Sequence, residues 1–210
     1  MKESALAELE LATQLIRARV CVTFLPESKT RSADLECHLG RERFLVEVTA
    51  MVGSAARRRM PLRGIARDEE QGEEEDRGVI LLHRILARIH QKAKQLADYC
   101  DPVVLHSSIP RADLQSGKSG RPEAIWLDVK VLSGAVTVLL TSLRHLSAVL
   151  ISLWDVEPLP SKAGTRLANV ELIERPKSQP THPRVRLLIQ NPGAAAPLTE
   201  REAEAFRLTL

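Results

Sequence analysis

The chain has 210 residues, of which 44% are apolar, enough for the core of one globular domain of ordinary size. Charged residues make up 27%, so the composition excludes a collagen-like or largely disordered chain. Aromatic residues make up 3%, which argues against a protein that stacks single-stranded bases on many rings, and the net charge of +3 is too small to identify a nucleic-acid partner.

The first predicted elements are a helix, a strand and a hairpin. Residues 4–19 have a helical spacing of apolar side chains. We expect the buried face of this helix to carry Leu6, Leu9, Ile16 and Val20. A short strand is expected at residues 20–25. Two alternating runs at residues 34–39 and 43–49, separated by a glycine-containing turn, then predict a β-hairpin.

Residues 53–78 form a long polar interruption after the hairpin. It begins with arginines at positions 57–59 and ends with acidic blocks at positions 68–70 and 73–76. Loops of this length inside a compact domain are usually functional or disordered. Two interpretations stay open: a solvated, flexible insertion whose charges partly neutralise each other, or a mobile lid or contact surface for a protein partner.

Helices and strands continue to alternate in the second half of the chain. The clearest helix covers residues 79–98, where apolar side chains recur at i, i+3, i+4 and i+7. Further segments are strands at 103–106, 125–131, 147–154, 169–174 and 184–189, a helix at 136–146, and loops at 109–123 and 157–165. A final helix at 200–208 begins with a capping box of Thr199 and Glu202. The order α-β-β-β-α-β, with extra C-terminal strands and a helix, predicts a single α/β domain over residues 1–210 with a mixed sheet flanked by helices.

The sequence predicts a cytoplasmic protein without a membrane partner. Cys21, Cys37 and Cys100 are odd in number and form no CxxC pair, so we expect free, buried thiols. Residues 1–15 contain three glutamates and lack the apolar region of a signal peptide. No apolar stretch reaches the roughly 20 residues that a membrane span needs.

Two acidic residues oppose each other across the hairpin if its turn has two residues. With Gly40 and Arg41 as the turn, paired positions sum to 81, so that Asp34 lies opposite Glu47. Opposed side chains lie about 5 Å apart at Cβ, where two carboxylates repel each other unless a cation such as Mg²⁺ lies between them. Alternatively, Asp34 begins an exposed strand and Glu47 pairs with an arginine such as Arg43.

These residues resemble the core of the PD-(D/E)XK nuclease superfamily. Its signature is an Asp at the start of one strand, followed on the next strand by an acidic residue, any residue and Lys. Asp34 and Glu47 match the two acids, and Thr49 stands at the Lys position. Gln95 and Tyr99 are similar to the QxxxY motif of RecB-type members. The resemblance covers about half the chain, and the remainder has the general look of bacterial proteins with this kind of core. It implies a restriction-endonuclease-like core, Mg²⁺ or Mn²⁺ at the two acids, and hydrolysis of phosphodiester bonds in DNA rather than RNA.

Thr49 is the main departure from the family pattern, because a hydroxyl group supplies no cation. Either the domain has lost catalysis, or another cation reaches the site from the following helix. At 100° per residue, one flank of that helix carries Arg88, Lys92, Gln95 and Tyr99. Lys92 is the candidate for the missing cation, and the other three are candidates for nucleic-acid contacts. The alternative is that all four are surface and boundary residues, with Lys92 extending into water.

The resemblance therefore implies a metal-dependent nuclease-like protein that acts on DNA. Asp34, Glu47 and Lys92 are the candidate catalytic residues, and the first two are the candidate ligands of Mg²⁺ or Mn²⁺. Glu8 and Glu10 either supply a further metal ligand or form a solvated face of the first helix. The alternative function is a catalytically inactive nuclease-fold domain that binds nucleic acid or protein. A third interpretation is an unrelated α/β protein.

Overall fold

In the computed structural model, the chain is described at residues 2–26, 33–51, 71–109, 125–159, 167–177 and 181–210. The helices are α1 (Lys2–Arg17), α2 (Gln71–Ala93), α3 (Val129–Thr141) and α4 (Glu200–Arg207). The strands are β1 (Cys21–Phe24), β2 (Leu35–Leu39), β3 (Glu42–Ala50), β4 (Val103–Ile109), β5 (Ile125–Leu127), β6 (Ala148–Leu153), β7 (Val156–Pro158), β8 (Val170–Glu174) and β9 (Val185–Gln190).

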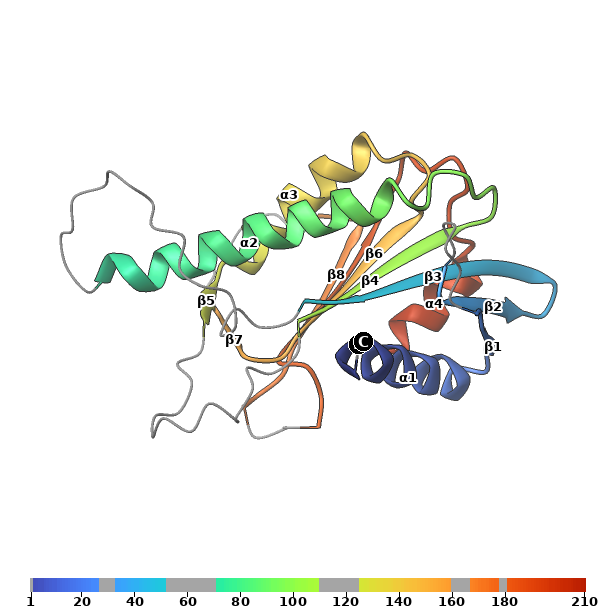
Figure 1. Ribbon diagram of the computed structural model, residues 1–210, viewed down its shortest axis with the longest axis horizontal. Coiled ribbons are helices and arrows are strands. Elements are labelled where there is room, and N and C mark those ends of the chain that lie inside the picture. Colours follow the sequence, from blue (N-terminus) through green and yellow to red (C-terminus); the bar gives the residue numbers. More distant parts are fainter. Residues whose placement is uncertain (1, 27–32, 52–70, 110–124, 160–166, 178–180) are drawn as a thin grey trace.

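A seven-stranded mixed sheet lies at the centre of the molecule, with the strand order β1-β2-β3-β4-β6-β9-β8 (Figure 1). The pairs β3–β4 and β4–β6 are parallel, and the other neighbours are antiparallel. A small parallel sheet of β5 and β7 stands apart from it. The chain runs α1-β1-β2-β3-α2-β4 through its first half. The predicted α-β-β-β-α-β order and the mixed α/β sheet are therefore confirmed.

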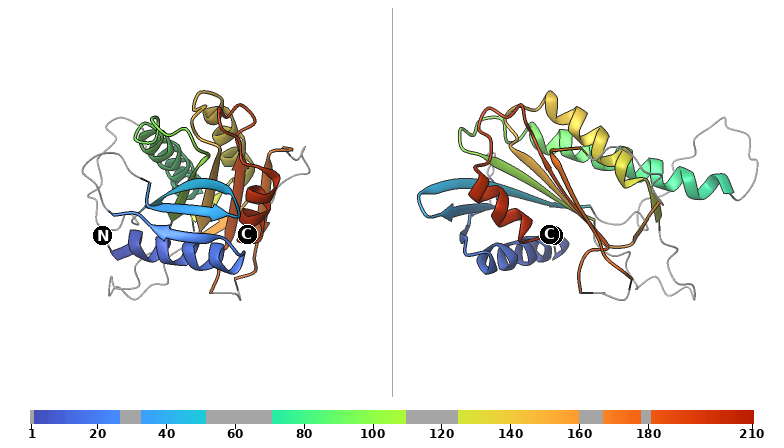
Figure 2. Two further views of the ribbon diagram at one scale, coloured as in Figure 1. Left: turned by 90° about the vertical axis from the view of Figure 1, so that its right-hand side faces the viewer. Right: turned by 180° about the vertical axis from the view of Figure 1, so that it is seen from behind.

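Helices cover both faces of the sheet, with α2 and α3 on one face and α1 and α4 on the other (Figures 1 and 2). The alternation of side chains along β3 separates the two cores. Leu45 packs in the core beneath α2 and α3. Phe44, Val46 and Val48 pack in the core beneath α1 and α4, where the ring of Phe44 lies 5.4 Å from that of Phe206. Odd-numbered side chains from 45 to 49 consequently face α2.

The buried face of α1 differs from the predicted face. Leu6, Leu9 and Ile16 are 65%, 54% and 55% exposed, whereas Val20 is buried just beyond the helix. The face that packs on the sheet carries Ala7, Leu11, Ala12 and Leu15. The prediction was wrong because it followed the larger apolar side chains, while the sheet accepts a stripe in which two alanines allow close approach of the helix.

Helix α2 begins earlier and ends earlier than predicted. It includes residues 71–78, so the second acidic block belongs to a helix rather than to a polar loop, and residues 53–70 lie outside the described part of the chain. Acidic residues near a helix N-terminus interact favourably with the helix dipole, which helps to explain the early start. Gly78 allows α2 to pack closely on β5, because a Cβ atom there would collide with the carbonyl oxygen of Trp126.

Helix α3 starts where the sequence suggested a strand. The predicted strand at 125–131 ends at residue 127, because the Asp128 side chain accepts hydrogen bonds from the backbone of Lys130 and Val131 at 2.9 Å and caps the helix. The predicted loop at 157–165 includes the end of β7, and residues 160–166 and 110–124 are not described. The capping box at the start of α4 is confirmed.

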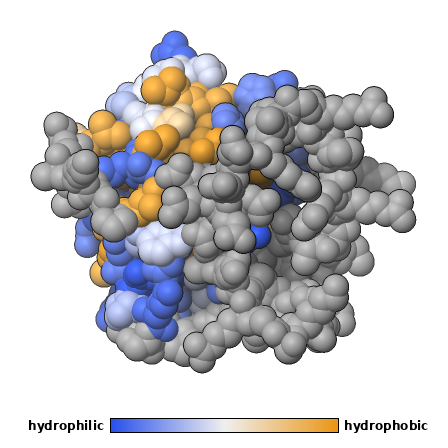
Figure 3. All heavy atoms as spheres, turned by 90° about the vertical axis from the view of Figure 1, so that its left-hand side faces the viewer, coloured by the Kyte–Doolittle hydropathy of each residue, from blue (hydrophilic) through white to orange (hydrophobic). Residues whose placement is uncertain are grey.

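Apolar side chains also remain on the surface. Val131 and Val138 of α3 are 54% and 71% exposed, and Figure 3 shows apolar groups gathered at the end of the molecule where α2 and α3 approach the small sheet. The three cysteines are free, but only Cys37 is buried; Cys21 and Cys100 are exposed, contrary to expectation. Within the described part of the chain, no helix combines the length and apolar character that crossing a membrane requires.

Candidate active site

The β2–β3 hairpin has the predicted register. Leu39 pairs with Glu42 across a two-residue turn in which Gly40 has a φ of 68°, a left-handed conformation that favours glycine. Asp34 lies directly before β2, and its backbone N–H donates to the Val46 carbonyl at 3.0 Å. The regular pairing ends at Leu35 and Val46, and this bond, one position out of register, holds Asp34 beside the middle of β3.

The carboxyl groups of Asp34 and Glu47 lie close enough for the charge of Asp34 to raise the pKa of Glu47. Asp34 Oδ2 also accepts the backbone N–H of Val48 at 2.7 Å, which holds this carboxyl group against β3. Glu47 is 4% exposed and points toward α2. Burial raises the pKa of Glu47 to about 7, against the opposing effect of a hydrogen bond from Lys92, and the negative charge of Asp34 raises it further.

Lys92 of α2 completes the pair of carboxyl groups. Its Nζ donates to Glu47 Oε1 in an ion pair, with the lysine side chain 20% exposed and the glutamate side chain 5% exposed. The alternative pairing of Glu47 with Arg43 is wrong: the Arg43 guanidinium instead bonds Glu36 at 3.1 Å and Asp101 at 2.6 Å. The structure thus brings together the three residues that the sequence selected as catalytic candidates.

Thr49, which the resemblance places at a lysine position, accepts a hydrogen bond from a second cationic residue of α2. Arg88 Nε donates to Thr49 Oγ1 at 2.8 Å, and Arg88 Nη1 donates to Gln91 Oε1 at 3.1 Å. Thr49 is 1% exposed and pairs across the sheet with Ser107, whose buried hydroxyl has no hydrogen-bond partner in the described part of the structure. Sequence reasoning treated Thr49 as a lost cation and did not find this contact or Ser107.

Tyr99 and Gln95 occupy different environments. The Tyr99 hydroxyl accepts the backbone N–H of Ala33 at 2.8 Å, which fastens the segment before Asp34 to the end of the α2 region. Gln95 is exposed, and its backbone N–H donates to the Lys92 carbonyl at 2.9 Å. Tyr99 therefore positions the protein's own chain, while Gln95 lies on the surface near the site.

Comparisons with protein-family models, curated protein sequences and solved structures find no match. The resemblance to the PD-(D/E)XK superfamily therefore depends on the residues and topology of this chain alone. Within the described residues, no group of three or more His, Cys, Asp or Glu side chains is arranged to hold a metal.

Glu8 and Glu10 do not join this pair. They lie on α1, which packs on the face of the sheet opposite to α2. Glu8 accepts a hydrogen bond from the Ser4 hydroxyl at 3.2 Å, and Glu10 accepts one from the Gln14 amide at 3.3 Å. The structure therefore gives no support to a metal ligand from the first helix.

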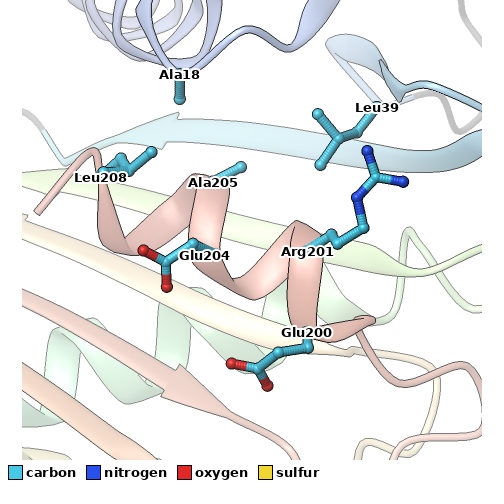
Figure 4. Close-up of a pocket in the computed structure, with 7 residues that line it drawn as sticks. All are labelled: Ala18, Leu39, Glu200, Arg201, Glu204, Ala205 and Leu208. Carbon is cyan, nitrogen blue, oxygen red and sulfur yellow. The ribbon is translucent and has the colours of Figure 1, made fainter.

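A shallow pocket lies on the α1 and α4 side of the sheet, away from the carboxyl pair. Its lining combines apolar groups with a charged rim on α4 (Figure 4). The lining residues are Ala18, Leu39, Glu200, Arg201, Glu204, Ala205 and Leu208. The pocket and the carboxyl pair occupy opposite faces of the sheet, so the pocket is not part of the candidate active site.

Proposed function

We propose that the protein is a metal-dependent nuclease of the PD-(D/E)XK type, with a restriction-endonuclease-like core, that hydrolyses phosphodiester bonds in DNA. One observation carries the proposal: the carboxyl groups of Asp34 and Glu47 meet on β3, and Lys92 reaches them from the following helix. The order of helices and strands around this site supports the same core.

The two carboxyl groups fit Mg²⁺ or Mn²⁺. Mg²⁺ is typically bound by one or two carboxylates, with waters and phosphate oxygens as its remaining ligands. The raised pKa of Glu47 means that the pair resists carrying two negative charges near neutral pH, a resistance that a divalent cation removes. Asp34 and Glu47 would hold the ion. A bound ion supplies an acidified water and positive charge for the phosphate oxygens.

The protein groups around this pair have separable roles. The Val48 backbone N–H keeps Asp34 against β3, and Tyr99 holds the preceding residue. Lys92, partly open to solvent, is placed to neutralise charge that develops on a phosphate beside Glu47. Arg88, anchored by neutral Thr49, keeps its positive charge available on the same flank of α2.

The alternative is a nuclease fold without catalysis that binds nucleic acid or protein. It is favoured by the Glu47–Lys92 ion pair, which gives the buried carboxylate a cation from the protein itself. It is also favoured by Thr49, whose hydroxyl is engaged with Arg88 at the position where the family has a lysine. Both observations argue against catalysis, and neither argues against binding of nucleic acid or protein.

Cleavage of plasmid DNA by the purified protein with Mg²⁺, Mn²⁺ or EDTA tests the proposal. We expect metal-dependent cleavage that falls on the order of a hundredfold in Asp34→Asn and Glu47→Gln, because each removes a candidate metal ligand. Glu36→Gln is the matched control, since Glu36 lies on β2 but bonds Arg43 and His38. Cleavage that survives in both site variants would end the enzyme claim. DNA binding without cleavage, and without a rise in melting temperature on adding metal, would favour the inactive alternative.

A further inference from the structure

We infer that Arg84, Arg88 and Lys92 form a cationic row along α2 that binds the phosphate backbone of a nucleic-acid strand and leads it to the carboxyl pair. The inference rests on the proposed function for the class of ligand, because the row ends at Lys92 beside Glu47. It adds to that function a binding surface, a direction for the bound strand and a residue, Arg84, outside the candidate active site.

The sequence of α2 has an uneven distribution of charge. Residues 77–93 include four arginine and lysine residues and no aspartate or glutamate. Three of the four, at positions 84, 88 and 92, are spaced by four residues. This spacing places successive side chains about 6 Å apart along the helix and turns each by about 40° from the one before. The three cations therefore form a continuous row on one flank.

Two members of this row keep their charge unneutralised. Arg84 is exposed and has neither an ion pair nor a hydrogen bond to any side chain that the structure describes. Among the described residues, Arg88 bonds two neutral oxygens, those of Thr49 and Gln91, at 2.8 and 3.1 Å. Elsewhere on the described surface, Arg43 and Arg207 each bond at least two carboxylates. The acidic residues of α2 all lie in its first turns, so the surplus of positive charge is confined to residues 77–93.

Phosphate groups are the anions that fit this arrangement. A guanidinium fork matches the oxygens of a phosphate, and its charge survives at all physiological pH values. A row of such groups, one turn of helix apart, suits a ligand with regularly repeated charges rather than a single anion. Contacts to a phosphate backbone carry no sequence information, so we expect the row to bind strands of different sequence equally well.

The test is the salt dependence of DNA binding, measured by fluorescence anisotropy with a labelled oligonucleotide in EDTA. Arg84→Ala is the main variant because Arg84 is exposed and makes no hydrogen bond or ion pair with a side chain that the structure describes. Lys94→Ala is the matched control, because it also removes one positive charge. Lys94 is exposed and lies just beyond α2, on the opposite flank from the row. Removing one phosphate contact lowers the slope of log K against log salt by roughly 0.7–0.9.

We expect Arg84→Ala to show this lower slope and about threefold weaker binding at moderate salt, and Lys94→Ala to resemble the wild-type protein. Equal slopes for the two variants would overturn the inference, as would displacement of the DNA by poly-glutamate at the same charge concentration. The assay contains no divalent metal, so its result is independent of catalysis. Metal-dependent cleavage with an unchanged Arg84→Ala slope leaves the proposed function standing without the row. Absence of cleavage with a lowered slope leaves the row standing without the enzyme.

Discussion

Replacing Glu47 by glutamine tests whether the buried carboxyl pair has the electrostatics described above. Glu47 is 4% exposed, and its side chain contacts Asp34 and Lys92. Its pKa rises from an ordinary 4.5 to about 7, first because of burial, in spite of the hydrogen bond from Lys92. Glutamine keeps the shape and the acceptor oxygen for Lys92 but cannot ionise.

The raised pKa determines the sign of the effect on stability. Between pH 4.5 and 7, the folded protein keeps a proton on Glu47 that the unfolded chain has released. The free energy of unfolding of the wild-type protein therefore falls as pH rises through this window, by about 1.4 kcal/mol per pH unit. The total is on the order of 3 kcal/mol and is complete above pH 7. Glu47→Gln lacks this pH-dependent loss. The free energy of unfolding of the variant, relative to that of the wild type, therefore rises by about 3 kcal/mol from pH 4.5 to 8.

Urea denaturation in EDTA at pH 5, 6, 7 and 8 measures the difference. Titrating groups that do not contact Glu47, including the histidines, contribute equally to both proteins and cancel in the comparison, whereas Asp34 and Lys92 are part of the measured difference. Glu174→Gln is the control, since Glu174 is an exposed carboxylate on β8. Parallel stability curves for the wild-type and Glu47→Gln proteins between pH 5 and 8 would refute the description of Glu47 as a buried carboxyl group with a raised pKa.

Three further predictions follow from buried groups outside this pair. Burial, together with the charge of Arg186, lowers the pKa of His106 to about 3 from 6.5, so the free energy of unfolding falls as pH drops below 6.5. We expect His106→Gln to remove about 2 kcal/mol of this loss at pH 5. Equal shifts of the urea midpoint from pH 7 to pH 5 in the wild-type and His106→Gln proteins would contradict this prediction. Tyr99→Phe removes the acceptor of the Ala33 N–H, so the free energy of unfolding measured in urea should fall by about 1 kcal/mol. The rise in melting temperature on adding metal should also become smaller. If neither quantity changes, Tyr99 has no positioning role. Phe206→Ala should cost about 3–5 kcal/mol, because its buried ring packs 5.4 Å from another phenylalanine, and a loss below about 1 kcal/mol would show that the helix repacks.

Much of the sheet could be predicted from local patterns. The turn at Gly40 and Arg41 determines the register of the hairpin, because a two-residue turn leaves one pairing in which alternating side chains keep their faces. β6 is buried along its whole length and appears in the sequence as a short, mostly apolar run. β4 is equally buried, but His106, Ser107 and Ser108 interrupt its apolar pattern, so the sequence predicted a strand only as far as residue 106. Both kinds of signal are contained in fewer than twenty consecutive residues.

The faces and ends of the helices could not be predicted in the same way. Leu6 and Ile16 are large and apolar, yet the sheet buries a stripe that includes Ala7, and the choice depends on the shape of the surface beneath α1. The position of α2 against the small sheet depends on its close packing on β5 at Gly78, a contact between segments almost fifty residues apart. Tertiary packing overrides local preference at both places.

The two-residue turn sets a register that ends at Leu35 and Val46 and leaves Asp34 near Glu47, but the partners on α2 depend on how the helix lies along β3. Two strand residues, from Glu47 to Thr49, span about 6.6 Å, and four helical residues, from Arg88 to Lys92, span about 6 Å. Because the helix runs back along the strand, these nearly equal steps allow the contacts Glu47–Lys92 and Thr49–Arg88 to form together. A lysine side chain at position 49 would point toward the space that Arg88 already fills. The threonine on β3 and the cations on α2 are therefore one arrangement, in which the positive charge beside the carboxyl pair comes from the helix rather than from the strand.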